Sequence, residues 1–166
     1  MKIFYLPFVL LFTYFGYSQD FNWTSDFNDT DQIDTCNATL ALNNNDGNLS
    51  NQNKTLTICP SDPDEVISLE FISFSLNTTF STLEIYNGNS TNSPLVFEYV
   101  SDATPPNPSY IASNPSGCIT IKFTTTFIPS IINIGFGAQF VCGDPCQDIF
   151  PEVNIDGNTT CETTDD

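Results

Sequence analysis

Residues 64–88 decide the fold of this chain, and they read DEVISLEFISFSLNTTFSTLEIYNG. Two apolar runs, residues 66–76 and 83–86, flank a short polar segment, and the second run ends on Asn87-Gly88. Runs of this kind are typical of β-strands, and Asn-Gly is a frequent tight turn. The stretch therefore predicts a β-hairpin that is followed by a turn.

The apolar alternation changes phase within the first of these runs. Its apolar positions are, in order, Ile67, Leu69, Phe71, Phe74 and Leu76. Because successive side chains of a strand point to opposite faces, all five can face one core only if the strand contains one extra residue. We predict a β-bulge around Ile72-Ser73.

The remainder of the chain shows further strand patterns and no sustained 3.6-residue apolar period. Strands are predicted at residues 38–42, 55–59, 95–100, 118–123 and 133–142. In the fourth of these, Ile119, Ile121 and Phe123 share one face. The predicted fold class is all-β.

Four short motifs resemble those of the CUB domain, an extracellular β-sandwich. Along the chain they are Thr57-Ile58-Cys59-Pro60, Phe71-x-x-Phe74, Leu83-Glu84-Ile85-Tyr86-Asn87-Gly88 and Gly135-Phe136-Gly137-Ala138-Gln139-Phe140. The resemblance covers residues 35–142 and implies a CUB-like antiparallel β-sandwich of the jelly-roll type. We expect one inter-sheet core that contains Phe71, Phe74, Leu83, Ile85, Ile121, Phe123, Phe136 and Phe140.

The N-terminus has the pattern of a secretory signal peptide. Met1-Lys2 is followed by an apolar run over residues 3–15 and then by Gly16-Tyr17-Ser18-Gln19. A positive start, an apolar centre and small residues at the exit predict a signal over residues 1–19, cleaved near Ser18 or Gln19. The run is shorter than the ~20 residues that span a bilayer. We expect a secreted or cell-surface protein with no membrane insertion after signal removal.

The mature chain is strongly acidic. Once Lys2 is removed, Lys54 and Lys122 remain as cations against twenty Asp and Glu, a net charge of −18, and the chain has no Arg and no His. Such a surface repels nucleic acid and anionic lipid. Residues 20–34 are predicted to form an acidic leader strand or linker. Its Asp26, Asp29, Asp31 and Asp34 could ligate calcium, but the segment lacks the Gly and the distal Glu of an EF-hand loop.

The chain has six cysteines, Cys36, Cys59, Cys118, Cys142, Cys146 and Cys161. In a secreted protein they predict three disulfides rather than a metal cluster, and fifteen pairings are open. The CUB resemblance implies Cys36–Cys59 and Cys118–Cys142, which leaves Cys146–Cys161.

The sequence offers little catalytic equipment. Without histidine there is no Ser-His-Asp or Cys-His arrangement, and paired cysteines leave no free thiolate. Glu70 and Glu84, expected on the polar faces of adjacent strands, could form a glycosidase carboxylate pair, although exposed Glu on a strand is ordinary. We expect no catalytic residue and no cofactor.

Many CUB domains bind calcium, and the corresponding positions here carry no carboxylate. They fall on Asn77, Ser81 and Thr125-Thr126. Calcium normally draws on several oxygens, with anionic ones among them. No metal site is therefore expected.

The sequence favours a non-catalytic extracellular recognition or adhesion module for protein or glycan. The alternatives are an accessory domain of a secreted hydrolase and a structural subunit that assembles through a sheet edge such as residues 120–127. The candidate contact loops are residues 87–94 and residues 126–133; the second carries Phe127, Ile128, Ile131 and Ile132.

The chain beyond the sandwich differs in composition. Residues 143–166 are rich in Pro, Asp and Thr and are predicted to be a linker or the start of a following domain, with a disordered acidic tail as the alternative. The Tyr17-Ser18-Gln19 exit and the CGDPCQ phrase resemble the N-termini of surface proteins of Bacteroidetes-type bacteria.

Overall fold

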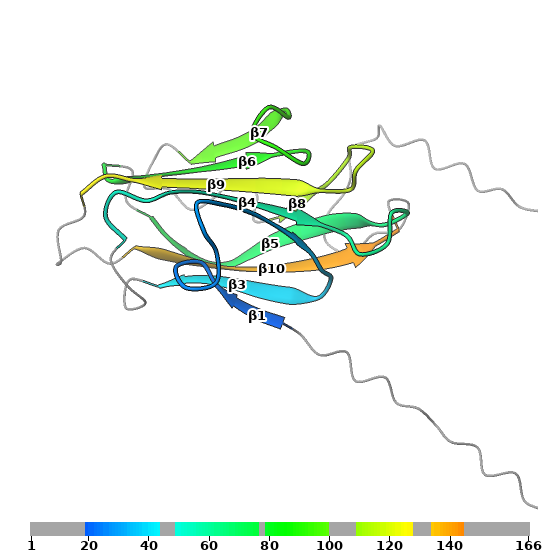
Figure 1. Ribbon diagram of the computed structural model, residues 1–166, viewed down its shortest axis with the longest axis horizontal. Coiled ribbons are helices and arrows are strands. Elements are labelled where there is room, and N and C mark those ends of the chain that lie inside the picture. Colours follow the sequence, from blue (N-terminus) through cyan, green and yellow to red (C-terminus); the bar gives the residue numbers. More distant parts are fainter. Residues whose placement is uncertain (1–18, 44–48, 77–78, 100–108, 128–133, 145–166) are drawn as a thin grey trace, which may run out of the picture.

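A computed structural model describes residues 19–43, 49–76, 79–99, 109–127 and 134–144. These residues form strands and no helix, arranged as two five-stranded sheets that pack face to face (Figure 1). The all-β sandwich predicted from the sequence is therefore confirmed.

Both sheets are built to the same plan. Sheet A has the order β1 (Gln19–Asn22), β3 (Ala38–Asn43), β10 (Gly135–Gly143), β5 (Val66–Ser75) and β8 (Ser109–Ile111). Sheet B has the order β2 (Thr30–Asp34), β4 (Asn53–Cys59), β9 (Ile119–Thr125), β6 (Ser81–Tyr86) and β7 (Leu95–Tyr99). In each sheet the first pair is parallel and the other three pairs are antiparallel, so the sheets are mixed rather than purely antiparallel.

The acidic segment at residues 20–34 is part of both sheets. Strand β1 pairs with β3 at one edge of sheet A, and β2 pairs with β4 at one edge of sheet B. The sandwich therefore includes residues that the sequence analysis set apart as a leader.

The predicted hairpin between the two apolar runs is wrong. Strand β5 lies in sheet A and β6 in sheet B, so the chain crosses between the layers instead of folding back within one. Each strand has another partner on both sides, β10 and β8 for β5, and β9 and β7 for β6. The short polar connection is long enough for the ~10 Å between packed sheets. The hairpin that does form joins β6 to β7.

The predicted β-bulge is confirmed. The β5–β10 register pairs Phe71 with Ala138 and Ser73 with Gly137, which leaves Ile72 as the extra residue. The bulge turns Ile72 outward, where 61% of it is exposed, and returns Phe74 to the core side. The rings of Phe71 and Phe74 consequently meet with their centroids 5.3 Å apart.

The predicted core positions all lie in the inter-sheet core, with Phe74 partly buried and the others buried. Their packing is organised around Trp23, which is fully buried. Its ring lies 6.1 Å from that of Phe123 in sheet B and 5.8 Å from that of Phe136 in sheet A. The crossover between β1 and β2 thus supplies the side chain that contacts both layers.

A buried lysine holds this crossover in place. Lys54 of β4 is 8% exposed, and its Nζ donates hydrogen bonds to the carbonyl oxygens of Phe27 (2.7 Å), Thr24 (3.1 Å) and Trp23 (3.3 Å). These bonds are charge-assisted, so they are stronger than bonds between neutral groups. The turn that carries Trp23 is anchored to sheet B by a single ammonium group.

Aromatic side chains also close the opposite side of the sandwich, where the edge strands β7 and β8 lie. The ring of Tyr110 in β8 packs against Phe97 of β7 and Phe71 of β5, with centroid distances of 5.3 and 6.3 Å. The Tyr110 hydroxyl is buried without a hydrogen-bond partner. Burial raises the pKa of Tyr110 to about 12, because the phenolate would lose its hydration.

The disulfides pair differently from the expectation. Cys36 is bonded to Cys142 and Cys59 to Cys118, so both implied pairings are wrong. The reason is topological: Cys36 leads into sheet A whereas Cys59 ends a strand of sheet B, so cysteines that are near in sequence belong to opposite layers. Cys146 and Cys161 lie outside the described residues.

Each observed bridge continues an antiparallel ladder. Ile58 pairs with Ile119 in β4–β9, and the next residues outward are Cys59 and Cys118. In β3–β10, Ala38 pairs with Phe140, and two residues further out on each strand stand Cys36 and Cys142. The disulfides therefore join strands within a sheet.

Non-reducing peptide mapping is expected to recover Cys36–Cys142 and Cys59–Cys118. The bridges span sequence separations of 106 and 59 residues, so in the chain-entropy model each contributes about 4–5 kcal/mol by restricting the unfolded chain. Replacing Cys59 and Cys118 together by Ser should lower the free energy of unfolding by that amount in a denaturant titration. Recovery of a Cys36–Cys59 peptide would contradict the ladder assignment.

Truncation of the central aromatic residues should separate core from surface. We expect Phe136→Ala to lower the free energy of unfolding by about 3–5 kcal/mol, since a buried phenylalanine leaves a cavity. Phe74→Ala should cost less because its side chain is only partly buried. Phe127, which is 70% exposed, supplies the control. Equal melting temperatures for Phe136→Ala and Phe127→Ala would contradict the packing.

The buried ammonium predicts a further loss of stability. Lys54→Met keeps the aliphatic volume but removes three hydrogen bonds, and we expect it to lower the free energy of unfolding by about 3 kcal/mol. Lys122→Met is the matched control, because its surface ion pair with Glu84 should contribute under about 1 kcal/mol. Chemical denaturation measures both. A Lys54→Met variant as stable as the control would show that the crossover does not need its anchor.

Candidate recognition surface

Two of the positions that the resemblance assigns to the calcium site of CUB domains are buried, and one of them, Thr125, forms internal hydrogen bonds. Ser81 and Thr125 face each other in the β6–β9 ladder and are 4% and 5% exposed. The Thr125 hydroxyl donates to the carbonyl oxygen of Leu49 and accepts from the backbone N–H of Gln52 at 2.9 Å. This oxygen is neutral and already engaged. Asn77 lies outside the described residues.

The aspartates of residues 20–34 act on local turns. Asp26 accepts hydrogen bonds from the backbone N–H of Asn22 (2.7 Å) and the hydroxyl of Ser25 (2.8 Å), which hold its pKa below the ordinary value. Asp31 accepts from the backbone N–H of Asn28 at 2.6 Å. These carboxylates satisfy backbone donors where the chain turns between β1 and β2. Within the described residues they do not converge on a shared cation position.

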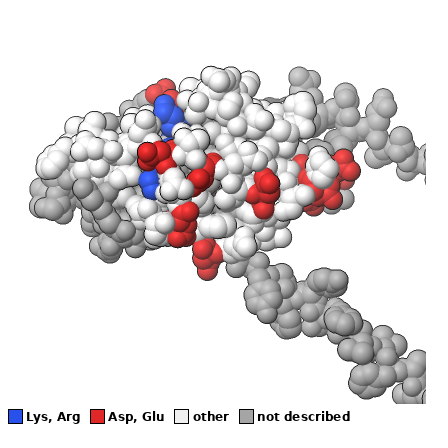
Figure 2. Space-filling model, viewed as in Figure 1, with Lys and Arg blue, Asp and Glu red and all other residues white. Residues whose placement is uncertain are grey.

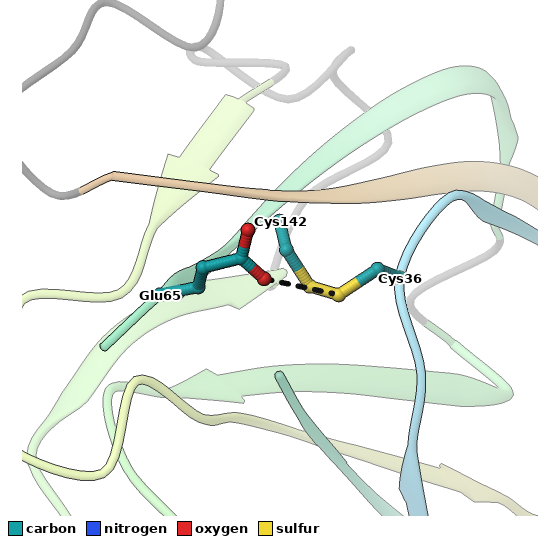
Figure 3. A group of neighbouring side chains, drawn as sticks. All are labelled: Cys36, Glu65 and Cys142. Atoms are coloured by element: carbon teal, nitrogen blue, oxygen red, sulfur yellow. Dashed lines mark hydrogen bonds between the residues drawn. A yellow bond between two sulfur atoms is a disulfide. The ribbon is translucent and has the colours of Figure 1, made fainter. Parts of the chain in front are cut away.

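Among the described residues, one group of three potential ligands comes together, and it consists of Cys36, Glu65 and Cys142. Their ligand atoms lie within 4.8 Å of one another, and Figure 3 shows the Glu65 carboxylate directed at the disulfide. While the two sulfurs are bonded to each other, neither is a thiolate that could bind a metal ion.

Glu70 and Glu84 lie on the outer faces of different sheets, so the expectation that they occupy adjacent strands is wrong. Glu70 accepts a hydrogen bond of 2.6 Å from the side-chain amide of Gln139. Glu84 accepts from Lys122 Nζ at 2.6 Å and from the hydroxyl of Tyr86 at 3.0 Å. Two carboxylates on opposite faces of the sandwich cannot attack one glycosidic bond together.

The negative charge of Glu84 is balanced within its own cluster by the ammonium group of Lys122. The hydrogen bond that Lys122 donates to Glu84 raises the pKa of the lysine. The pKa of Tyr86 is raised by burial and by the hydrogen bond that its hydroxyl donates to Glu84. With both pKa values raised, Lys122 and Tyr86 each retain the proton that they donate to the Glu84 carboxylate. Acidic side chains are otherwise spread over the face viewed in Figure 2, with only small basic areas between them.

The connection between β6 and β7, residues 87–94, is a partly exposed loop and is called the tip here. Asn87 fixes it to the neighbouring β8–β9 connection. Its side-chain amide donates to Ser113 Oγ at 2.7 Å, and its Oδ1 accepts from the Ser113 backbone N–H (3.0 Å) and the Asn114 side-chain amide (2.7 Å). Asn114 also donates to the carbonyl oxygen of Cys118 at 2.9 Å.

Gly88 gives the tip its shape. Its φ is +153°, and a Cβ at this position would lie 2.2 Å from Ser93 Oγ, so a larger residue would push the loop apart. The carbonyl oxygen of Gly88 accepts from the buried Thr120 hydroxyl at 2.8 Å. The Asn87-Gly88 pair, predicted to form a tight turn, begins the eight-residue loop over residues 87–94, which is closed by the Asn87 N–H donating to the Pro94 carbonyl oxygen at 2.9 Å.

The tip presents polar and apolar groups side by side. Asn89, Thr91, Asn92 and Pro94 are exposed, and the adjoining Leu95 and Val96 of β7 are 48% and 47% exposed. The loop was predicted from the sequence, whereas the exposure of these two apolar neighbours was not. Pro94, directly before them in the sequence, was the signal that could have indicated an exposed edge strand, because proline within sheets is largely confined to edge positions.

The second candidate loop is described only in part. Phe127 is 70% exposed, while Ile128, Ile131 and Ile132 lie outside the described residues. The proposed assembly edge, residues 120–127, is wrong as an edge, because β9 is flanked by β4 and β6. The structure has no helical span suited to a bilayer within its described residues.

No family model matches this chain, and no curated protein matches it. Solved structures do. The CUB1-EGF-CUB2 domains of rat MASP-1 align with a TM-score of 0.51 and 13% identity over 69% of this chain and 42% of theirs. The MASP-1 CUB2 domain bound to Ca²⁺ aligns with a TM-score of 0.46 and 14% identity over 67% of this chain and 96% of that domain. The chain thus spans under half the length of the first of these structures. Its described residues form a CUB-like β-sandwich.

Proposed function

We propose that this chain is an extracellular, non-catalytic recognition module that contacts a protein or glycan through its tip. The observation that carries the proposal is a loop of a CUB-like sandwich that exposes Asn89, Thr91, Asn92 and Pro94 and is hydrogen-bonded through Asn87 to the neighbouring connection. Loops that bind partners are commonly displayed on a rigid scaffold in this way.

Several features support the extracellular setting. Both disulfides of the described residues are of a kind that persists in oxidising compartments, and the N-terminal pattern is that of a signal peptide. With a net charge of −17 for the full chain, a polyanionic partner such as nucleic acid is disfavoured. The tip is suited to a protein or neutral glycan whose surface offers groups that hydrogen-bond to side-chain amides, together with a small apolar area.

The absence of catalysis is supported by the side chains themselves. The chain contains no histidine, the described cysteines are paired, and Glu70 and Glu84 are bonded on opposite faces. The module is also proposed to act without calcium, since Ser81 and Thr125 supply buried neutral oxygens where the family places acids.

Binding to panels of glycans and extracellular proteins tests the role. A partner found for the secreted chain should lose at least tenfold in affinity when Leu95 and Val96 are both replaced by Ser. Ile72→Ser is the matched control, because Ile72 is an apolar residue on the outer face of sheet A that is even more exposed than Leu95 and Val96. Binding should be unchanged by a calcium chelator.

A partner that binds the Leu95/Val96 variant with undiminished affinity would contradict contact through the tip and its adjoining apolar residues. A chain that binds nothing on either panel would contradict the recognition role. Loss of binding in chelator would show a calcium-dependent mode and direct attention to Asp26, Asp29, Asp31 and Asp34.

A further inference from the structure

The two disulfides differ in how accessible they are. Cys59 and Cys118 are buried, with 8% and 3% exposure. Cys36 and Cys142 are both partly exposed. Thiol–disulfide exchange requires an external thiolate to reach a sulfur atom. Cys36–Cys142 is therefore the bridge that a thiol from solvent meets first.

A carboxylate stands beside this bridge. Glu65 Oε2 lies 3.7 Å from Cys36 Sγ (Figure 3). A cystine sulfur carries no hydrogen, so the contact is a hydrogen bond only after reduction. Asp62 and Asp64 lie close by in the same connection and are exposed. The lysines of the described residues are engaged elsewhere, Lys54 with backbone carbonyls and Lys122 with Glu84, so neither compensates Glu65.

We propose that Cys36–Cys142 is a thiol-exchange site whose choice of thiol is set by Glu65: it reacts preferentially with cationic thiols and resists anionic ones. The accessible disulfide supplies the electrophile, and the carboxylate supplies the selectivity. The buried Cys59–Cys118 bridge keeps sheet B closed while the exchange takes place.

The charge flow of the reaction explains the role of Glu65. An incoming thiolate forms a bond to one cysteine sulfur as the Cys36–Cys142 bond breaks, and the other cysteine departs as a thiolate that then takes a proton from water. A second external thiol attacks the mixed disulfide and releases the external disulfide. Two external thiols are thus oxidised, and the protein bridge is reduced to two thiols.

Either direction of attack places negative charge near the carboxylate. Attack on Cys142 develops charge on Cys36, 3.7 Å from Glu65. Attack on Cys36 instead brings the anionic thiolate itself to that position. A unit-charge repulsion at about 4 Å in water corresponds to about a fivefold change in rate. An ammonium group on the attacking thiol offsets it.

The experiment compares the secreted chain with Glu65→Gln, using 3-mercaptopropionate as the anionic thiol and cysteamine as the cationic one. Opening of each bridge is followed by quenching with iodoacetamide and peptide mapping, with rate constants referred to thiolate concentration. We expect Glu65→Gln to speed opening of Cys36–Cys142 by mercaptopropionate about fivefold. The ratio of the mercaptopropionate and cysteamine rate constants should rise at least threefold.

Controls keep the test decisive. Glu98→Gln, on the exposed edge strand of sheet B, should leave both rate constants unchanged, and Cys59–Cys118 should open last in every variant. If Glu65→Gln fails to fold, 1 M NaCl added to the parent should shrink the preference for cysteamine, because exposed charges are screened. The proposal would be overturned if the ratio of the mercaptopropionate and cysteamine rate constants were the same in the parent and in Glu65→Gln. It would also be overturned if the parent's preference for cysteamine did not respond to salt, or if Cys59–Cys118 opened before Cys36–Cys142.

Discussion

The contact of the Trp23 indole with both sheets is the interaction on which the sandwich depends. Each sheet can bury only one face, and the two faces must be filled by side chains that interdigitate. Trp23 packs edge-on against Phe123 and Phe136, which belong to different layers. Since its backbone lies in the crossover between β1 and β2, the position of the indole depends on that turn, and the turn is held by the ammonium of Lys54. A charged residue therefore stabilises the placement of the largest apolar one.

The register of the antiparallel β4–β9 ladder links this core to the exposed surface. Cys59–Cys118 closes the end of β4–β9, and the carbonyl oxygen of Cys118 accepts a hydrogen bond from Asn114. Asn114 in turn donates to Asn87, which begins the tip. A covalent bridge, a ladder and a short chain of side-chain amides thus connect the core to residues 87–94. The tip is thereby tied to the core through hydrogen bonds of Asn87 and Asn114.

Polar side chains on the outer face of each sheet form hydrogen bonds with one another. On sheet B, the Thr57 and Thr120 hydroxyls lie 3.0 Å apart, and Lys122, Glu84 and Tyr86 form a hydrogen-bonded group. On sheet A, Gln139 donates to Glu70. Partners of this kind satisfy groups that would otherwise be available for chemistry. Among the described residues, the tip and the part-exposed bridge beside Glu65 are two accessible places, and the two proposals concern them.

Local pattern was sufficient for seven of the ten described strands, β3 to β7, β9 and β10, for the bulge at Ile72 and for the core positions, because alternation of side chains along one strand decides which face each residue takes. It also supplied the resemblance to CUB domains and the loop at residues 87–94. Pairing could not be predicted in this way: β5 and β6 look like a hairpin in sequence yet lie in opposite sheets. Residues 20–34 were expected to be a leader strand or linker, yet this part of the chain adds a strand to each sheet. The same holds for Cys36–Cys142, Cys59–Cys118 and the approach of Glu65 to a sulfur 29 residues away in sequence. Strand patterns record which side of a strand is apolar, whereas the partner of a strand is selected by the packing of all ten together. Only the tertiary structure could decide those neighbours.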